Sequence, residues 1–265
     1  MVDYSDFEDL QVEVKDGIGH FQIMRPERLN AMRTTTFWEI VELGRRLQVD
    51  SDVRVVVCTH SGRGFSSGAD IVDRDPTNPP DRPEATKTDS MGMSVMGMTM
   101  SKIDKPTIAS INGVTAGAGF ALASSFDMRF LGPNARFITV FARRALSPDC
   151  GLTYWLPRLV GPAKALELLY TSRDVLAEEA VAIGLGNALV DDPDARAFEV
   201  ARQLVEGPPL SYMWMKREIQ HSYLATPQTQ IEFEWAAQNQ IRTSEDAAEG
   251  RASFREKRPA KFVGR

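Results

Sequence analysis

The segment KPTIASINGVTAGAGFA, residues 105–121, decides how the rest of the chain is interpreted. Pro106 suits the head of a strand, because proline fixes φ and has no N–H to donate. Residues 107–111 then predict a buried strand, which Asn112-Gly113 ends in a turn. The small residues 117–119 come directly before a buried helix that opens at residues 120–123. A strand, a tight turn and a helix start leave backbone N–H groups unpaired and directed outward.

Such N–H groups bind either a phosphate or a carbonyl oxygen that becomes negative during a reaction. Phosphate is the weaker choice, because the G-x-G-x-x-G fingerprint would need a glycine where Leu122 stands, and no Gly-Lys-Ser/Thr of a P-loop is present. The carbonyl interpretation requires a second donor elsewhere. The glycine-rich loop at residues 62–71 can supply one through the N–H of Ala69.

The same loop contains G-x-S-x-G at Gly64, Ser66 and Gly68, which is the spacing of a hydrolase nucleophile. His221 is the only histidine after it, and no Asp-to-His pattern leads there. A glycine-rich loop produces this match by chance. We therefore interpret the loop as a second strand-to-helix turn.

Composition excludes several classes of protein. At 265 residues the chain is one large domain, or one domain with an appendage. A net charge of -5 without a basic run argues against nucleic acid as a partner. No apolar stretch is long enough for a membrane span, and two cysteines without CxxC fit a reducing compartment. The first ten residues are acidic and have no apolar core, so we expect no signal peptide. We expect a cytoplasmic protein, with no metal site because the three histidines lack ligand spacing.

The chain is rich in strands at first and helical at the end. Residues 10–14 and 18–24 alternate as a hairpin, residues 34–49 form an amphipathic helix, and residues 53–59 form a buried strand. Further predicted elements are strands at 127–131, 136–140 and 188–190, and helices at 152–160, 163–170, 177–184, 195–206, 212–224, 228–241 and 245–254. We expect an α/β core over residues 1–200 and a helical region over 201–265 that serves assembly.

Several motifs appear together in order. They are RPERLNAM at 25–32, SSGADI at 66–71, KPTIASINGVTAGAGFALA from 105, LPRLVG at 156–161 and EDAAEGRASFREKRPAKF at 245–262. On these motifs the chain resembles the crotonase superfamily, also called the enoyl-CoA hydratase/isomerase family. The resemblance implies a spiral of ββα repeats with a C-terminal helical trimerisation region. It also implies a homotrimer or hexamer and an acyl-CoA thioester as substrate.

The resemblance places an oxyanion hole at the N–H groups of Ala69 and Ala118, the same two turns that the residues themselves indicate. Coenzyme A is part of the substrate, so no separate cofactor is implied. The implied CoA-binding residues are Arg28, Leu29, Ala69, Asp70, Ile71, Ala118, Phe254 and Lys257. For Lys257, a solvated surface charge is an equal alternative.

Two segments shape the acyl pocket in this interpretation. Residues 75–89 are rich in proline and charge and predict a surface loop. Methionines follow at 91, 93, 96, 98 and 100. They predict a core-packing helix, with an adaptable wall for a variable acyl chain as the alternative.

The chain departs from the hydratase pattern of the family. Hydratases use two glutamates to activate water, and those positions hold Ala121 and Phe141 here. Neither side chain can transfer a proton, so hydration lacks its acid and base.

One carboxylate remains, Asp149 in SPDCG at 147–151. It matches the aspartate of a subgroup of isomerases and of related dehalogenases. The combination with Ala121 and Phe141 most resembles the ring-epoxide isomerases of phenylacetyl-CoA degradation and the Δ3,Δ2-enoyl-CoA isomerases. The resemblance thus implies a Δ3 to Δ2 or related isomerisation, with Asp149 as base, in fatty-acid or aromatic-acid degradation. Alternatives are an Asp149 that only caps a helix near residue 151, a hydratase-type lyase with an unidentified acid, or a non-catalytic acyl-CoA-binding protein.

Overall fold

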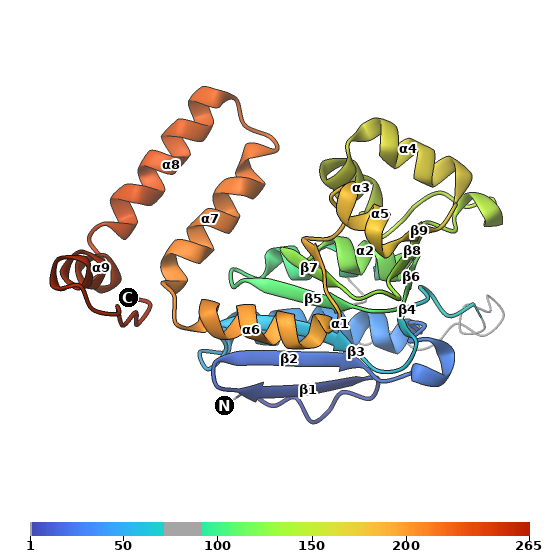
Figure 1. The fold of residues 1–265 in the computed structure, drawn as a ribbon, viewed down its shortest axis with the longest axis horizontal. Helices are drawn as coiled ribbons and strands as arrows, with labels where there is room; N and C mark the ends of the chain where they lie inside the picture. The colour runs from blue at the N-terminus through green and yellow to red at the C-terminus, as the bar shows by residue number, and fades with distance from the viewer. Residues whose placement is uncertain (1, 72–91) are drawn as a thin grey trace.

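Two β-sheets form the core of the computed structural model, which describes residues 2–71 and 92–265 (Figure 1). Across the six-stranded sheet the order is β1 (Leu10–Lys15), β2 (Ile18–Ile23), β3 (Val55–His60), β5 (Thr107–Ile111), β7 (Met128–Leu131) and β10 (Ala188–Leu189). Across the four-stranded sheet it is β4 (Gly64–Ser66), β6 (Val114–Ala116), β8 (Arg136–Ile138) and β9 (Val175–Leu176).

The chain alternates between these sheets. It passes from β3 to β4, from β5 to β6 and from β7 to β8, so each turn adds one parallel strand to each sheet. The predicted strand at residues 107–111 is confirmed as β5, and all five of its residues are buried. The helix α2 (Ala118–Ser124) follows β6, as the small-residue turn predicted. This alternation is the predicted spiral.

The N-terminal predictions are confirmed as well. β1 and β2 pair antiparallel around Asp16 and Gly17, which both have positive φ, as a tight turn requires. The helix α1 (Thr34–Val49) buries an apolar face, with Ile40 and Leu43 0% exposed. These side chains belong to the main core cluster with β2 and β3.

The methionine-rich segment differs from its prediction. It forms two short 3-10 helices, η3 (Gly92–Met98) and η4 (Met100–Lys102), instead of one α-helix. Its packing role is confirmed, because Met96 and Met100 are fully buried. The loop predicted at residues 75–89 and Met91 lie outside the described residues.

Helices make up most of the rest. They are η1 (Pro26–Arg28), η5 (Ala142–Arg144), α3 (Leu152–Val160), α4 (Pro162–Thr171), α5 (Ala177–Ala182), α6 (Pro193–Val205), α7 (Pro209–Ser222), α8 (Pro227–Ile241) and α9 (Glu245–Glu256). Ala197 and Ala201 of α6 pack on β3 and β5, so α6 covers one face of the six-stranded sheet.

Of the last three helices, α7 bonds to the core through Lys216 and Arg217, while α8 and α9 lie farther from it (Figure 1). The expected boundary between residues 200 and 201 falls inside α6, and the chain leaves the sheet after Val205. Arg54 on the core donates hydrogen bonds to the carbonyl oxygens of Val205 (2.7 Å) and Phe262 (2.8 Å), which ties the C-terminal segment back to the sheet. Among the described helices, none is both long and apolar enough to cross a membrane.

Candidate active site

The two glycine-containing turns lie directly against each other. Gly68 has a positive φ of 91°, and a Cβ there would lie 2.7 Å from the carbonyl oxygen of Ala116 and 3.4 Å from the amide nitrogen of Ala118. A Cβ on Gly119 would lie 2.5 Å from the carbonyl oxygen of Ser66. Only glycine permits this approach, so the loop after β4 touches the start of α2.

The two predicted oxyanion donors have no acceptor in the described part of the chain: the N–H groups of Ala69 and Ala118 are both unpaired. The amides beside them are fixed. Asp70 N donates to Met32 O (2.9 Å), and Gly117 N donates to Ile138 O (3.2 Å). Two oriented, unpaired donors can stabilise a carbonyl oxygen as it becomes negative.

A cavity of about 480 Å³ opens at these donors. Its described lining comprises Arg28, Ala31, Ser67, Gly68, Ala69, Asp70, Ile71, Gly117, Ala118, Val140, Phe141, Arg144, Leu146 and Asp149. The structure therefore brings together the predicted Arg28, Asp70 and Ile71 with both oxyanion donors. Leu29 lies beside the cavity, where its carbonyl oxygen accepts a hydrogen bond from Ser67 N (2.9 Å).

Asp149 also lines this cavity. The alternative that it caps a helix is wrong: the N-cap of α3 is Gly151, and no side chain makes a capping hydrogen bond there. Of the two carboxylates in the described lining, Asp70 pairs with Arg25 at 2.9 Å, whereas Asp149 has no ion pair. Asp149 is thus the lining carboxylate available to a ligand.

The two glutamate positions of a hydratase are apolar surfaces in the structure. Ala121 is completely buried in α2, and Phe141 is 6% exposed and lines the cavity beside Asp149. Neither Ala121 nor Phe141 has a carboxylate that could bind a water molecule.

Ser66 has a structural role. It is 0% exposed, and its Oγ donates to Asn30 O (2.8 Å) and accepts from Gly68 N (3.2 Å). A nucleophile must reach its substrate, so the serine-hydrolase alternative is wrong.

Sequence reasoning missed Val140 and Arg144. Val140 adopts a positive φ of 57°, a strained conformation for a β-branched residue, at the cavity wall. Arg28 and Arg144 both line the cavity without an acidic partner in the described residues. The adjacent pair Arg143-Arg144 was a visible signal, but sequence alone does not show which of the two faces the cavity.

Phe254 and Lys257 are not brought to this cavity within one chain. Phe254 lies on α9 and is 85% exposed, and Lys257 is the C-cap of the same helix. In Figure 1, α9 lies at the opposite end of the molecule from β4 and α2. Their predicted contact with CoA stays a prediction. The described methionines Met93, Met96, Met98 and Met100 are also absent from the lining.

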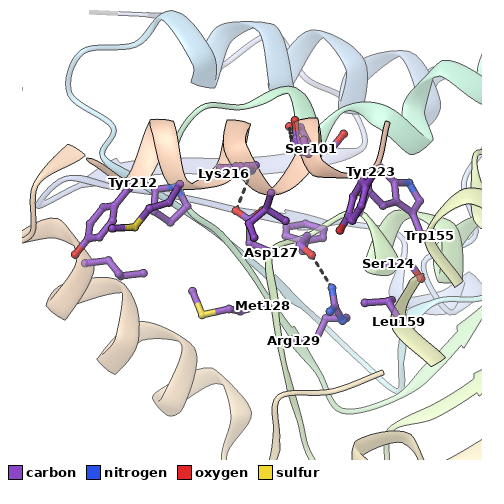
Figure 2. A pocket seen from close by; sticks show the side chains of 17 residues that line it. Ser101, Ser124, Asp127, Met128, Arg129, Trp155, Leu159, Tyr212, Lys216 and Tyr223 are labelled. Carbon is purple, nitrogen blue, oxygen red and sulfur yellow. Dashed lines mark hydrogen bonds and ion pairs between the residues drawn. The ribbon is translucent and has the colours of Figure 1, made fainter. Parts of the chain in front are cut away.

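A second cavity of about 400 Å³ lies between the core and α7 (Figure 2). Lys216 donates to Asp127 Oδ2 (2.9 Å) and to Met100 O (3.0 Å), while Arg129 donates to Leu185 O (2.7 Å) and to Phe126 O (2.6 Å). Burial lowers the pKa of Lys216, and it lowers the pKa of Arg129 to about 10. The charged groups that line this cavity thus form their hydrogen bonds with other groups of the protein. Nowhere in residues 2–71 and 92–265 could three or more His, Cys, Asp or Glu side chains together hold a metal ion.

The sequence profile of the family described as enoyl-CoA hydratase/isomerase matches residues 13–265. The chain belongs to this family. It is 34% identical to the 1,2-epoxyphenylacetyl-CoA isomerase of Escherichia coli (strain K12), over 95% of this chain and 97% of that protein. It is 32% identical to the short-chain-enoyl-CoA hydratase of Clostridium acetobutylicum, over 89% of this chain and 90% of that protein.

The fold agrees with this assignment. A crystal structure from Streptomyces coelicolor A3(2), ascribed to the enoyl-CoA hydratases, superposes with a TM-score of 0.91 and 33% identity, covering 100% of this chain and 98% of that one. The protein is therefore a crotonase-family enzyme that acts on acyl-CoA. Both an isomerase and a hydratase occur among its relatives, so family membership does not specify the reaction.

Proposed function

We propose that this enzyme isomerises an enoyl-CoA thioester, moving the double bond from Δ3 to Δ2 or carrying out a related isomerisation, in fatty-acid or aromatic-acid degradation. The observation that carries the proposal is Asp149. It shares a cavity with the unpaired N–H groups of Ala69 and Ala118, and it has no ion pair in the described structure.

The reaction needs one base and one oxyanion site. The thioester oxygen accepts hydrogen bonds from Ala69 N–H and Ala118 N–H. Asp149 removes a proton from C2, and the electron pair moves into an enolate whose negative oxygen those donors stabilise. The protonated Asp149 then returns the proton at C4, so the double bond shifts from C3–C4 to C2–C3. Proton transfer by a positioned carboxylate contributes about 10²–10⁴-fold to the rate.

Hydration is disfavoured by the same cavity. Adding water to a 2-enoyl-CoA requires groups that hold the water and protonate the α-carbon. The residues at the two glutamate positions are Ala121 and Phe141, whose side chains carry no titratable group.

We propose that CoA contacts Arg28, Leu29, Asp70 and Ile71 and that no cofactor is needed beyond the CoA of the substrate. Phe254 and Lys257 lie away from the cavity of their own chain (Figure 1), so a contact of theirs with CoA requires a second copy. A cytoplasmic location agrees with this substrate.

A trimer or hexamer would supply that copy. Large apolar side chains are exposed on α7 and α8, including Ile219 (61%), Ile231 (64%) and Trp235 (66%). Burying such a surface between subunits removes apolar area from water. Sedimentation equilibrium measures the molar mass of the wild type and of Trp235→Glu in solution and so tests this assembly. A monomeric wild type would contradict it.

The decisive experiment measures conversion of a 3-enoyl-CoA to its 2-enoyl isomer by wild type and Asp149→Asn, together with the dissociation constant of a saturated acyl-CoA for both. We expect the Asp149→Asn substitution to lower kcat at least about 10²-fold while the dissociation constant stays within about twofold. Hydration of a 2-enoyl-CoA is assayed in parallel.

Each outcome separates the candidate functions. Equal isomerase activity in both proteins would remove Asp149 from the mechanism. Binding without turnover by the wild type would favour an acyl-CoA-binding protein. Hydration faster than isomerisation would favour a hydratase-type lyase with an acid other than Asp149.

A further inference from the structure

Asp149 is followed by a stretch of backbone in an unusual conformation. Cys150 and Gly151 have positive φ angles of 51° and 74°, so two consecutive residues are left-handed. Cys150 is not a glycine, and a left-handed conformation at such a residue persists only when surrounding contacts maintain it. The direction in which Asp149 enters the cavity depends on those contacts.

Gly97 of η3 supplies the first contact. A Cβ on Gly97 would lie 1.6 Å from the carbonyl oxygen of Cys150 and 2.4 Å from its carbonyl carbon. No side chain fits there. The backbone of η3 therefore lies directly against the peptide that follows Asp149.

Trp155 of α3 supplies the second contact. Its indole Nε1–H donates to the carbonyl oxygen of Gly97 (2.8 Å), and its backbone N–H donates to the carbonyl oxygen of Gly151 (3.1 Å). Trp155 thus forms one hydrogen bond with Gly97 and another with the Cys150–Gly151 turn, the two segments that are in contact.

Trp155 is not part of the reactive cavity. Its ring lines the other cavity, beside Tyr223 and below α7 (Figure 2). Any effect of the indole N–H on the reaction must therefore pass through Gly97 and the turn that carries Asp149.

We infer that Trp155 is a positioning residue for isomerisation: its indole N–H holds Gly97 against Cys150 and so fixes the direction of the Asp149 carboxylate. This inference rests on the proposed function. A base that is displaced by about an ångström loses much of its rate advantage, although the substrate still binds.

The test is Trp155→Phe, which keeps an aromatic ring and removes the N–H. We expect kcat for the 3-enoyl-CoA to fall about 10-fold, while the dissociation constant of a saturated acyl-CoA stays within about twofold. Trp214→Phe on α7 is the matched control: it also removes an indole N–H, and the ring of Trp214 packs on Phe233 of α8. The control should keep its kcat.

The double variant Trp155→Phe/Asp149→Asn separates the two hypotheses. If Trp155 acts through Asp149, the double variant is no slower than Asp149→Asn alone. A further fall of about 10-fold would overturn the inference. If Asp149→Asn itself retains activity, the proposed function fails; if Asp149→Asn loses activity and Trp155→Phe does not, only the inference fails.

Amide hydrogen exchange gives a second measurement. The N–H of Leu152 donates to the carbonyl oxygen of Asp149 (3.1 Å) and reports on the order of the turn. It should exchange faster in Trp155→Phe than in wild type. Equal exchange rates would show that the indole N–H does not hold the turn, whether or not kcat changes.

Discussion

Two cavities in the described part of the chain have similar volumes, about 480 and 400 Å³, but their polar groups differ in whether they are paired. In the cavity at the two turns, the N–H groups of Ala69 and Ala118 have no acceptor and Asp149 has no ion pair in the described structure. In the cavity below α7, Lys216 and Arg129 are satisfied by protein oxygens. Unpaired polar groups in a cavity cost free energy until a ligand completes them. The unpaired groups therefore indicate a site for substrate. The paired charges of the other cavity contribute to the stability of the folded chain.

The largest expected effect separates two aspartates, one from each cavity. Asp149→Asn should lower kcat about 10³-fold, within the range of general acid–base catalysis, and leave the free energy of unfolding nearly unchanged. Asp127→Asn should do the reverse. Asp127 Oδ2 accepts from Lys216 Nζ (2.9 Å) and from Thr107 N (2.8 Å), so its loss should reduce the free energy of unfolding by about 2–4 kcal/mol. Steady-state kinetics and urea unfolding check both.

If Asp127→Asn lowers kcat of the folded enzyme as much as Asp149→Asn does, the distinction between the two cavities is wrong. Equal loss of stability in both variants would also contradict it.

A second comparison uses two glycines with positive φ. Gly68→Ala should lower kcat about 10²-fold, because the new Cβ would displace the loop from Ala116 O and from the oxyanion donor of Ala118. Gly161→Ala is the control: its φ is also positive, at 77°, but its Cβ would meet no atom within 4 Å. Gly161→Ala therefore introduces the same kind of backbone strain but leaves the N–H groups of Ala69 and Ala118 in place.

Both alanine variants should therefore lose stability in thermal unfolding, and only Gly68→Ala should lose kcat. A normal kcat in a folded Gly68→Ala enzyme would separate the donors from catalysis.

A third comparison concerns the adjacent residues Arg143 and Arg144, of which only Arg144 lines the cavity that contains Asp149. Arg144→Ala should raise KM about 10-fold, because Arg144 lines the cavity with no acidic partner in the described residues. Arg143→Ala should leave KM unchanged, since the side chain is exposed and does not line the cavity. Initial rates over a range of substrate concentrations measure both. Equal effects would indicate that general charge, not position, attracts the substrate.

The smallest expected effect is a pH dependence beside the second cavity. Burial lowers the pKa of Lys105 to about 8, below its ordinary value of 10.5. Between these values the unfolded chain holds a proton that the folded protein has released, so Lys105 makes the free energy of unfolding rise with pH. Lys105→Met should remove this contribution.

The measurement is the wild-type free energy of unfolding minus that of Lys105→Met, by urea titration at pH values of about 7.5 and about 9.5, on either side of the lowered pKa. The difference should increase with pH. The Cys58 thiol, whose pKa burial raises, acts in the opposite direction in this range, but it is present in both proteins and cancels. A constant difference would show that Lys105 titrates normally.

Much of the fold could be predicted because its signals are local. The hairpin of β1 and β2, helix α1 and strand β5 each follow from a period of apolar residues between turn residues. β4, β6 and β9 were not predicted. They have two or three residues each, and they are strands only because the spiral places them side by side in a second sheet.

The candidate active site also has a part that the sequence predicted and a part that only the structure shows. Motif residues predicted Ala69, Ala118 and Asp149, and the structure places all three at one cavity. Sequence could not show that Arg144 faces the cavity and Arg143 does not, or that Asp149 is unpaired in the described structure while Asp70 pairs with Arg25. Those facts depend on which segments of the chain surround each side chain.

The sequence by itself determined the hairpin of β1 and β2, helix α1, strand β5, the glycines at residues 68 and 119, and the absence of both hydratase glutamates. These are properties of single residues and of short periodic segments. Tertiary structure alone decided which polar groups stay unpaired, because pairing depends on contacts between distant segments. It brought β4 against α2 to leave two N–H groups open. It also placed Gly97 and Trp155 around the turn that carries Asp149, through packing that no local pattern encodes.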